Sequence, residues 1–299
     1  MSIRRLPLLS TLFAIGIFAG WQSPAFASDV PQCPADASPM DGWSDRAPPR
    51  KIFGNTYYVG TCGISSILVV GKQGAILIDG ATEKAPAAIE ANIRALGFKP
   101  SDVKLILSTH DHNDHAGGLA QLQRDSGAPV LARAPAAATL RRGSSDRSDP
   151  QFGELGKFPR VTHVRVIADG QVVRLGDLKL VAHATPGHTP GSTSWTWRSC
   201  EGERCANIAY VDSLTAISNK QYRYGDHPAY VTAFRHTIAT VASLPCDLLL
   251  TPHPTASDMF ARFAGTKPLI DAGACKTFSL HAGEALDQRL TDEANGKAP

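Results

Sequence analysis

The most constraining feature of this sequence is a cluster of ionisable side chains directly after a buried strand pattern. Residues 103–109 (VKLILST) form a short continuous apolar run, which is typical of a strand covered on both faces. The next six positions, His110 to His115, contain three histidines and two aspartates. Imidazole and carboxylate groups are costly to crowd together inside a protein unless they are paired or surround a cation. The pattern therefore indicates a metal site at the end of a buried strand.

The spacing of the four ligand-type side chains favours two metal ions over one. His110 and His112 alternate along an extended backbone, so their imidazoles point to one side. Asp114 and His115 fall where the chain turns into the next helix and face a neighbouring point. Neutral imidazole and carboxylate suit zinc, and two ions about 3.5–4 Å apart divide four such ligands with less strain than one ion. The alternative, a histidine-rich surface loop without ligand function, does not explain this motif directly after a buried strand.

Two further histidines complete three ligands per metal. His188 lies between two Pro-Gly turns in TPGHTPGS, and His253 ends a second buried run in LLLTPHP. Asp111 and Asn113 alternate with the ligands and should point away, toward solvent or toward hydrogen bonds with the ligands. The other histidines are expected to be structural or solvated, with one in a loop that could line a cleft: His163, His183, His236, His281 and, in the loop, His227.

The remaining pattern predicts two mixed βα halves packed into one sandwich-like α/β domain. Residues 28–50 are rich in Pro, Ser and Asp and predict an extended arm, and residues 141–160 break all periodicity and predict a mobile surface loop. A helix capped by Thr82 should end near Gly97. Another should cover residues 118–125, and a third should begin at Pro228. Strands are expected at residues 55–60, 65–70, 75–79, 128–133, 170–175, 178–184, 193–197, 206–211 and 246–253.

The N-terminal stretch predicts a secretory signal. Arg4 and Arg5 precede an apolar run, and the small residues Ala25 and Ala27 suggest cleavage after Ala27. The apolar run is short for a membrane span of about 20 residues, so we expect residues 1–27 to be removed, with no stable membrane anchor and a periplasmic location. Residues 28–299 should form one domain. Loss of two arginines lowers the formal charge from +3 to +1, which gives no support for nucleic-acid binding.

The six cysteines all lie after the predicted cleavage point. An even number in an exported chain predicts three disulfides, although six cysteines allow 15 pairings. Their order along the chain suggests Cys33–Cys62, Cys200–Cys205 and Cys246–Cys275. Disulfides of this kind stabilise an exported protein by roughly 2–4 kcal/mol each. A zinc ribbon is disfavoured, because no Cys-x-x-Cys occurs.

These motifs resemble a known family. The H-x-H-x-D-H motif, with His188 in PGHTPGS and His253 in TPHP, resembles the metallo-β-lactamase superfamily. The segments TPGHTPGSTSWTW, YVDSLTAIS and YYVGTCGIS are similar to the third subclass of class B β-lactamases. The likeness extends from about Asn55 to His253. It implies an αβ/βα four-layer sandwich, in which two mixed β-sheets are flanked by helices.

The resemblance also implies a role for individual residues. The first zinc would be held by His110, His112 and His188, and the second by Asp114, His115 and His253. Ser213 and Thr215 would bind the carboxylate of a β-lactam, although ordinary loop hydroxyls are an equal alternative. Related thioesterases use an aspartate near Asp212 to bridge both metals, so the function of that residue stays open. The loop at 141–160, with Gln151 and Phe152, would lie beside the substrate cleft.

The implied activity is zinc-dependent hydrolysis of penicillins, cephalosporins and carbapenems, which confers antibiotic resistance. Zinc lowers the pKa of a bound water to about 7, so a bridging hydroxide could attack the lactam carbonyl. Asp114 would orient that hydroxide and relay a proton as the catalytic residue. We expect a monomer whose partners are small β-lactam substrates. The alternatives are a thioesterase, a lactonase or a phosphodiesterase on the same fold, or a periplasmic zinc-binding protein without catalysis.

Overall fold

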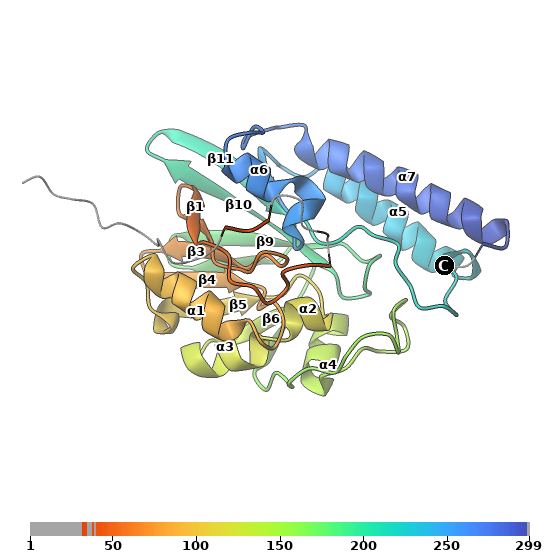
Figure 1. Ribbon diagram of the computed structural model, residues 1–299, viewed down its shortest axis with the longest axis horizontal. Helices are drawn as coiled ribbons and strands as arrows, with labels where there is room; N and C mark the ends of the chain where they lie inside the picture. The colour runs from red at the N-terminus through yellow and green to blue at the C-terminus, as the bar shows by residue number, and fades with distance from the viewer. Residues whose placement is uncertain (1–31, 35–37, 39, 298–299) are drawn as a thin grey trace, which may run out of the picture.

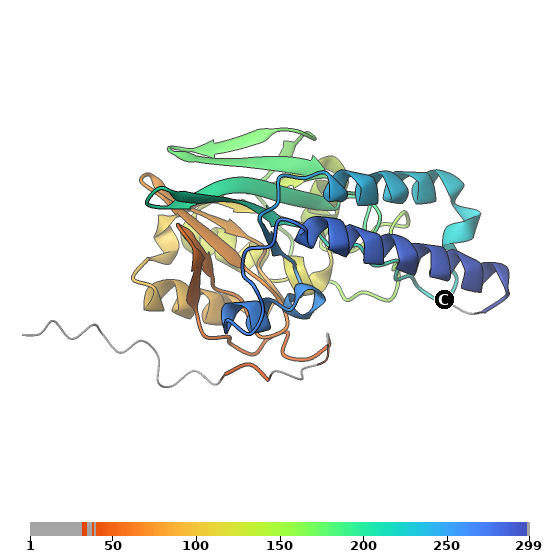
Figure 2. The ribbon, with the colours of Figure 1, turned by 90° about the horizontal axis from the view of Figure 1, so that it is seen from above.

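Two mixed β-sheets packed face to face form the centre of the protein. The computed structural model describes residues 32–34, 38 and 40–297. Figure 1 shows the sheets between two helical layers, with α1 and α3 on one side and α5 and α7 on the other. The turned view in Figure 2 shows α5 and α7 side by side along their length. This is the predicted αβ/βα sandwich, and the fold prediction is confirmed.

The larger sheet is antiparallel at its first edge and parallel toward its second. Its first four strands pair antiparallel, whereas β4, β5, β6 and β7 run parallel. Parallel neighbours need crossover connections, and α1 and α3 supply the first two. The strands, in spatial order, are β1 (Arg50–Phe53), β2 (Thr56–Tyr58), β3 (Ile67–Gly71), β4 (Gly74–Ile78), β5 (Val103–Leu107), β6 (Val130–Arg133) and β7 (Val164–Ile167).

The smaller sheet is antiparallel except for one edge strand. Only β11 and β12 run parallel, and α5 connects them across the outer face. A loop follows the carboxyl end of β5 in the large sheet and of β11 and β12 in the small sheet. The strands, in spatial order, are β12 (Leu248–Leu250), β11 (Arg204–Tyr210), β10 (Thr193–Glu201), β9 (Leu178–Ala184) and β8 (Val172–Leu175).

Three apolar clusters correspond to the three interfaces between layers. The central cluster lies between the sheets and includes the fully buried Trp195 and Tyr58. A second lies under α1, α3 and α4, and a third under α5 and α7. The helices are α1 (Pro86–Ala95), α2 (Asn113–Ala116), α3 (Leu119–Ser126), α4 (Ala134–Arg142), α5 (Pro228–Ala242), α6 (Met259–Phe263) and α7 (Ala274–Ala294), with 3-10 turns at Pro100–Asp102, Tyr224–Asp226 and Pro254–Ser257.

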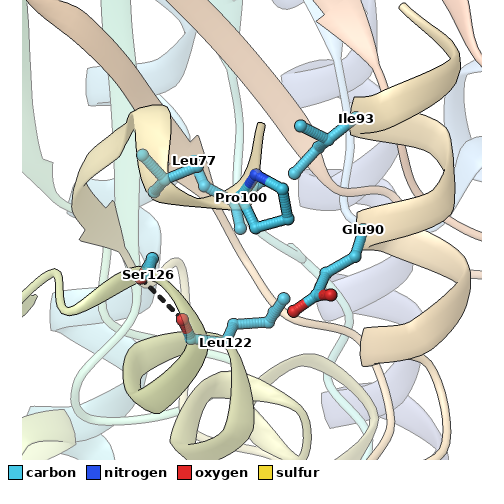
Figure 3. Close-up of a pocket in the computed structure, with 7 residues that line it drawn as sticks. Leu77, Glu90, Ile93, Pro100, Leu122 and Ser126 are labelled. Atoms are coloured by element: carbon cyan, nitrogen blue, oxygen red, sulfur yellow. Dashed lines mark hydrogen bonds between the residues drawn. The ribbon is translucent and has the colours of Figure 1, made fainter. Parts of the chain in front are cut away.

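The packing under α1 and α3 leaves almost no space. Figure 3 shows a cavity between these helices and the sheet, lined by Leu77, Ile93, Pro100 and Leu122, with the carboxylate of Glu90 at its rim. Its volume is about 10 Å³. That is at the lower limit for a single water molecule. The core under α1 and α3 is therefore closely packed at this point.

The structure contains the three disulfides suggested by the order of the cysteines. Cys33 is joined to Cys62, Cys200 to Cys205 and Cys246 to Cys275. The first attaches the N-terminal arm to the large sheet, and the last ties α7 to the segment before β12. Such disulfides are typical of proteins that fold outside the reducing cytosol.

Helix boundaries differ from the predictions in two places. The helix expected from Thr82 begins only at Pro86, whose fixed φ suits the first helical position, and Thr82 instead pairs its hydroxyl with Ser44. Helix α4 was missed, because its sequence APAAATLRR carries little apolar periodicity. The predicted loop at 141–160 therefore overlaps the last two residues of this helix, which ends at Arg142.

The predicted signal at residues 1–27 lies outside the described part of the chain. Among the residues that the structure describes, no helix is both long enough and apolar enough to cross a membrane.

Candidate metal centre

All six predicted ligands gather at one edge of the sandwich, where strands end. His110, His112, Asp114 and His115 follow β5, His188 follows β9, and His253 follows β12. The strands β5, β9 and β12 therefore place residues that lie more than 140 positions apart in the sequence within one cluster. Five of the six are buried, and only the side chain of His253 keeps 21% exposure.

Asp114, His115 and His253 form a tight triangle of potential ligand atoms. The Oδ2 atom of Asp114 lies 3.1 Å from Nε2 of His115 and 3.4 Å from Nε2 of His253. The two imidazole nitrogens are 3.2 Å apart. A tetrahedral zinc ion with bonds of about 2.0–2.1 Å separates its ligand atoms by about 3.3 Å. The donor set and its spacing therefore fit a zinc ion.

His110, His112 and His188 form a second, adjoining cluster. One ligand nitrogen from each lies within 4.8 Å of the others, and His110 is equally close to ligand atoms of Asp114 and His115. His110 consequently adjoins both clusters. Its Nε2 atom is buried and has no hydrogen-bond partner among the described residues. An orphaned nitrogen inside a group of imidazoles is what a ligand without its cation would show.

In each imidazole of this cluster, one ring nitrogen lies within hydrogen-bond distance of a protein oxygen. Nδ1 of His110 lies 2.7 Å from Oδ1 of Asp212, and Nε2 of His112 lies 3.0 Å from Oδ2 of Asp149. Nδ1 of His188 lies 3.0 Å from the carbonyl oxygen of Thr215. A histidine that donates one N–H to such a partner presents its other, unprotonated nitrogen to a metal.

Burial sets most of the ligands in the protonation state that a metal requires. Burial lowers the pKa of His188 to about 3, and the nearby His112 and His110 act in the same direction. Burial likewise lowers the pKa of His110 and His115. For Asp114, burial opposes ionisation, but the charges and hydrogen bonds of His115 and His253 hold its pKa well below the usual range. These shifts favour neutral imidazoles at His110, His115 and His188 and an ionised carboxylate at Asp114.

His112 is the exception. Burial would lower its pKa, but the hydrogen bond and charge of Asp149, together with the charges of Asp114 and Asp111, raise it above the usual value. Three carboxylates, those of Asp149, Asp114 and Asp111, therefore act on His112. A bound cation would be stabilised by the same carboxylates.

The loop after β11 lies beside the cluster of His110, His112 and His188. Thr215 is exposed and its Oγ1 atom is 2.9 Å from Nδ1 of His188, so the residue contacts a ligand as well as the surface. Ser213 is half-buried in the same loop. Asp212 is fully buried, and its second oxygen, Oδ2, has no partner among the described residues.

Asp111 and Asn113 point away from the ligands, as their alternation predicts. Asp111 is buried and accepts a hydrogen bond from the hydroxyl of Thr189, next to His188. Asn113 is half-buried. The other histidines lie outside the two clusters: His163, His236 and His281 are exposed, His183 bonds Thr196, and His227 stacks on Tyr222.

Sequence reasoning missed three residues that shape the centre. Asp149 orients His112 from within the predicted loop, where no spacing pointed to it. Trp43 lies in the N-terminal arm with its ring 5.9 Å from that of His253, and the pairing of Cys33 with Cys62 was the only hint that the arm would lie there. The third is Asp79, at the end of β4.

Asp79 ties three site loops together. Its carboxylate accepts hydrogen bonds from the backbone and hydroxyl of Thr109, directly before His110, and from the hydroxyl of Tyr210 at the end of β11. Burial raises the pKa of Asp79 to about 8. Its φ of +63° is uncommon for a residue other than glycine, and such conformations are concentrated at functional sites.

Comparison with known proteins agrees with this geometry. The model of the metallo-β-lactamase superfamily matches residues 59–201. The structure of the metallo-β-lactamase SMB-1 is 48% identical, with 84% of this chain and 99% of that chain covered and a TM-score of 0.81. The chain belongs to the metallo-β-lactamase superfamily. BJP-1 of Bradyrhizobium japonicum, a subclass B3 metallo-β-lactamase, is 34% identical, with a TM-score of 0.78. The match covers 87% of this chain and 99% of the BJP-1 chain.

A curated relative is named for an activity other than that of SMB-1 and BJP-1. The hydroxyacylglutathione hydrolase of Anaeromyxobacter dehalogenans is 33% identical over 54% of this chain and 50% of its own length. The chain thus spans about half the length of that relative. Superfamily membership therefore includes more than one kind of hydrolase.

Proposed function

We propose that this protein is a zinc-dependent β-lactamase of the third subclass of class B. It would hold two zinc ions, one on His110, His112 and His188 and one on Asp114, His115 and His253. The triangle of Asp114, His115 and His253, with edges of 3.1–3.4 Å beside the His110 cluster, is the observation that carries the proposal. The identity of 48% to SMB-1 supports the same activity. The proposed reaction is hydrolysis of the amide bond of penicillins, cephalosporins and carbapenems.

The side chains around the centre would each have a definite task. Zinc, when bound, lowers the pKa of water to about 7 and polarises a carbonyl oxygen. Asp114 contributes one oxygen to the triangle, and its other oxygen would orient the attacking water and take its proton. The hydroxyls of Ser213 and Thr215, in the loop that contacts His188, would donate hydrogen bonds to the substrate carboxylate.

A thioesterase is the second candidate, because the curated relative from Anaeromyxobacter is named as one. In such enzymes an aspartate near the position of Asp212 would bridge the two metals. Here Oδ1 of Asp212 accepts a hydrogen bond from His110 at 2.7 Å, which supports an orienting function for this carboxylate. Its other oxygen, Oδ2, is buried without a partner among the described residues, so Asp212 alone does not separate the two activities. The β-lactamase is favoured by the comparisons, because SMB-1 is 48% identical with 99% of its chain covered, whereas the thioesterase is 33% identical with 50% of its length covered.

The cellular setting is part of the same proposal. Three disulfides are consistent with export. We infer that residues 1–27 are a cleaved signal, that residues 28–299 form one periplasmic domain, and that the mature protein acts as a monomer on β-lactam antibiotics and confers resistance to them.

A substrate panel tests the assignment. The purified mature chain, loaded with zinc, is assayed on a penicillin, a cephalosporin, a carbapenem, a glutathione thioester and an acyl-homoserine lactone. We expect kcat/KM for the β-lactams to exceed the values for the other two substrates by orders of magnitude. A glutathione thioester turned over faster than any β-lactam would overturn the proposal and assign a thioesterase.

A further inference from the structure

The buried carboxylate of Asp149 connects the metal centre to a surface loop. Asp149 lies in the segment between α4 and β7 and is only 3% exposed. Its Oδ2 atom is 3.0 Å from Nε2 of His112, and its Oδ1 atom accepts the backbone N–H of Gln151 at 2.8 Å. One side chain thus holds a candidate metal ligand and the turn that begins the loop.

The contact determines which nitrogen of His112 faces the cluster. With Nε2–H donated to Asp149, Nδ1 carries no proton and is free to bind a cation. In His110 and His188 the two ring nitrogens are exchanged: Nδ1 bonds to a protein oxygen, and Nε2 is the nitrogen left for a cation. His112 therefore depends on Asp149 for a tautomer that its two neighbours do not share.

The same loop is tied to the segment that carries Thr215. The backbone N–H of Asn219 donates to the carbonyl of Pro150 at 2.8 Å, and its side-chain amide donates to the carbonyl of Phe152 at 2.8 Å. Thr215, four residues before Asn219, contacts His188. Residues 148–152 are here called the coupling loop. The loop contacts His112 directly and is connected to His188 through the segment from Thr215 to Asn219.

Open space beside Asp149 makes this connection adjustable. A cavity of about 230 Å³ lies next to it, and its wall includes Asp111, Thr139, Arg142, Asp146 and Ser148. Close packing does not fix the coupling loop from that side. Side-chain hydrogen bonds of Asp149 and Asn219, together with backbone bonds inside the loop, hold it on the other side. Of these side chains, Asp149 also contacts the candidate ligand His112.

We propose that Asp149 is a positioning residue that sets the tautomer of His112 and transmits the position of the coupling loop to the cluster of His110, His112 and His188. The inference rests on the proposed zinc centre and deepens it. A substrate that displaces the exposed Phe152 would alter the affinity for zinc, and zinc would order the loop in return.

Zinc affinity of the metal-free protein tests the positioning role without any substrate. Competition with a chromophoric chelator would compare Asp149→Asn and Asp149→Ala with Glu154→Gln, which removes an exposed charge from the same segment. Loss of a partner that orients a metal-bound histidine weakens metal binding by about 10–100-fold. We expect that loss for Asp149→Ala, a smaller one for Asp149→Asn, whose amide oxygen still accepts, and none for Glu154→Gln.

A spectroscopic signature separates positioning from general destabilisation. In the cobalt-substituted protein, the Nε2–H proton of His112 should give a shifted NMR signal that exchanges slowly with solvent. The signal should exchange fast in Asp149→Ala and stay slow in Glu154→Gln. Unchanged zinc affinity and unchanged exchange in both Asp149 variants would overturn the proposal.

Asn219→Ala tests the coupling itself, since Asn219 touches no proposed ligand. We expect a loss of zinc affinity of several-fold and faster exchange of the same signal. An effect of Asp149→Ala with none of Asn219→Ala would overturn the coupling and leave positioning alone. Dependence of zinc binding on Asp149 in a protein that hydrolyses no β-lactam would uphold this inference while the proposed function fails. A wild-type chain that binds no zinc would overturn both.

Discussion

The two halves of the metal centre are supported by the fold to very different degrees. In the half formed by His110, His112 and His188, each imidazole has a hydrogen-bond partner on its far side. In the half formed by Asp114, His115 and His253, the ligand atoms contact one another, and the Nδ1 atoms of both histidines have no partner among the described residues. His253 is also the most exposed of the six.

This difference indicates that hydrogen bonds of the protein orient the first half, whereas a bound cation would have to orient the second. A ligand already held in place loses little freedom when a metal binds, whereas mutually contacting ligands are kept apart by the ion. The second half also depends on segments that are far away in the sequence, namely the arm with Trp43 and the loop after β12. The two proposed zinc ions should therefore differ in affinity, and substitutions should affect one more than the other.

Asp114→Asn should have the largest effect on turnover. The substitution removes the only carboxylate from the triangle of Asp114, His115 and His253, and with it the proposed acceptor for the water proton. General acid–base assistance contributes about 10²–10⁴-fold, and we expect a loss of kcat in that range. Nitrocefin hydrolysis by the zinc-loaded variant provides the measurement. A near-normal rate would remove Asp114 from the mechanism and make the two halves equivalent.

Zinc should leave the two halves in sequence during chelation. We expect the second half to release its ion at a chelator concentration about tenfold or more below that needed for the first, given the effect of orienting partners on affinity. Bound zinc and residual activity are followed together through a titration with EDTA. Simultaneous release of both ions would contradict a difference between the halves, and activity that survives complete chelation would exclude zinc chemistry.

The metal-free protein should lose stability as the pH falls. The pKa of His188 is about 3 in the folded protein and 6.5 in an unfolded chain. As the pH falls, the imidazole is therefore protonated in the unfolded state before it is protonated in the folded state. The contribution to the free energy of unfolding is complete above pH 6.5 and is lost progressively down to about pH 3. Urea unfolding at several pH values measures the slope. His188→Gln should reduce that slope, and an unchanged slope would show that burial does not control this imidazole.

Trp43→Ala should have the smallest effect and only on the second half. The ring of Trp43 lies beside His253 at 5.9 Å, on an arm held by the disulfide of Cys33 and Cys62. We expect a weakening of the second zinc by a few-fold, with the first zinc unchanged. The chelator titration described above resolves the two. A matching loss in both halves would indicate that the arm supports the whole fold.

Local sequence patterns predicted most of the strands and the residues that gather in the candidate metal centre, because both leave short-range patterns in the sequence. The apolar run before His110 and the turn residues around His188 place those ligands at strand ends without any knowledge of tertiary structure. Helix α4 and the start of α1 could not be predicted, since an alanine-rich segment has no strong apolar period and Pro86 overrides the capping signal of Thr82. Asp149, Asp79 and Trp43 were also out of reach, because their functions depend on contacts across 30 or more positions.

The most direct test of the account is a zinc titration of the demetallated mature chain, with bound zinc and carbapenem hydrolysis measured in the same samples. We predict that two zinc ions bind per chain and that hydrolysis appears as the sites fill and disappears on chelation. A protein that binds both ions and leaves the carbapenem intact, or that hydrolyses it equally well without metal, would contradict the account.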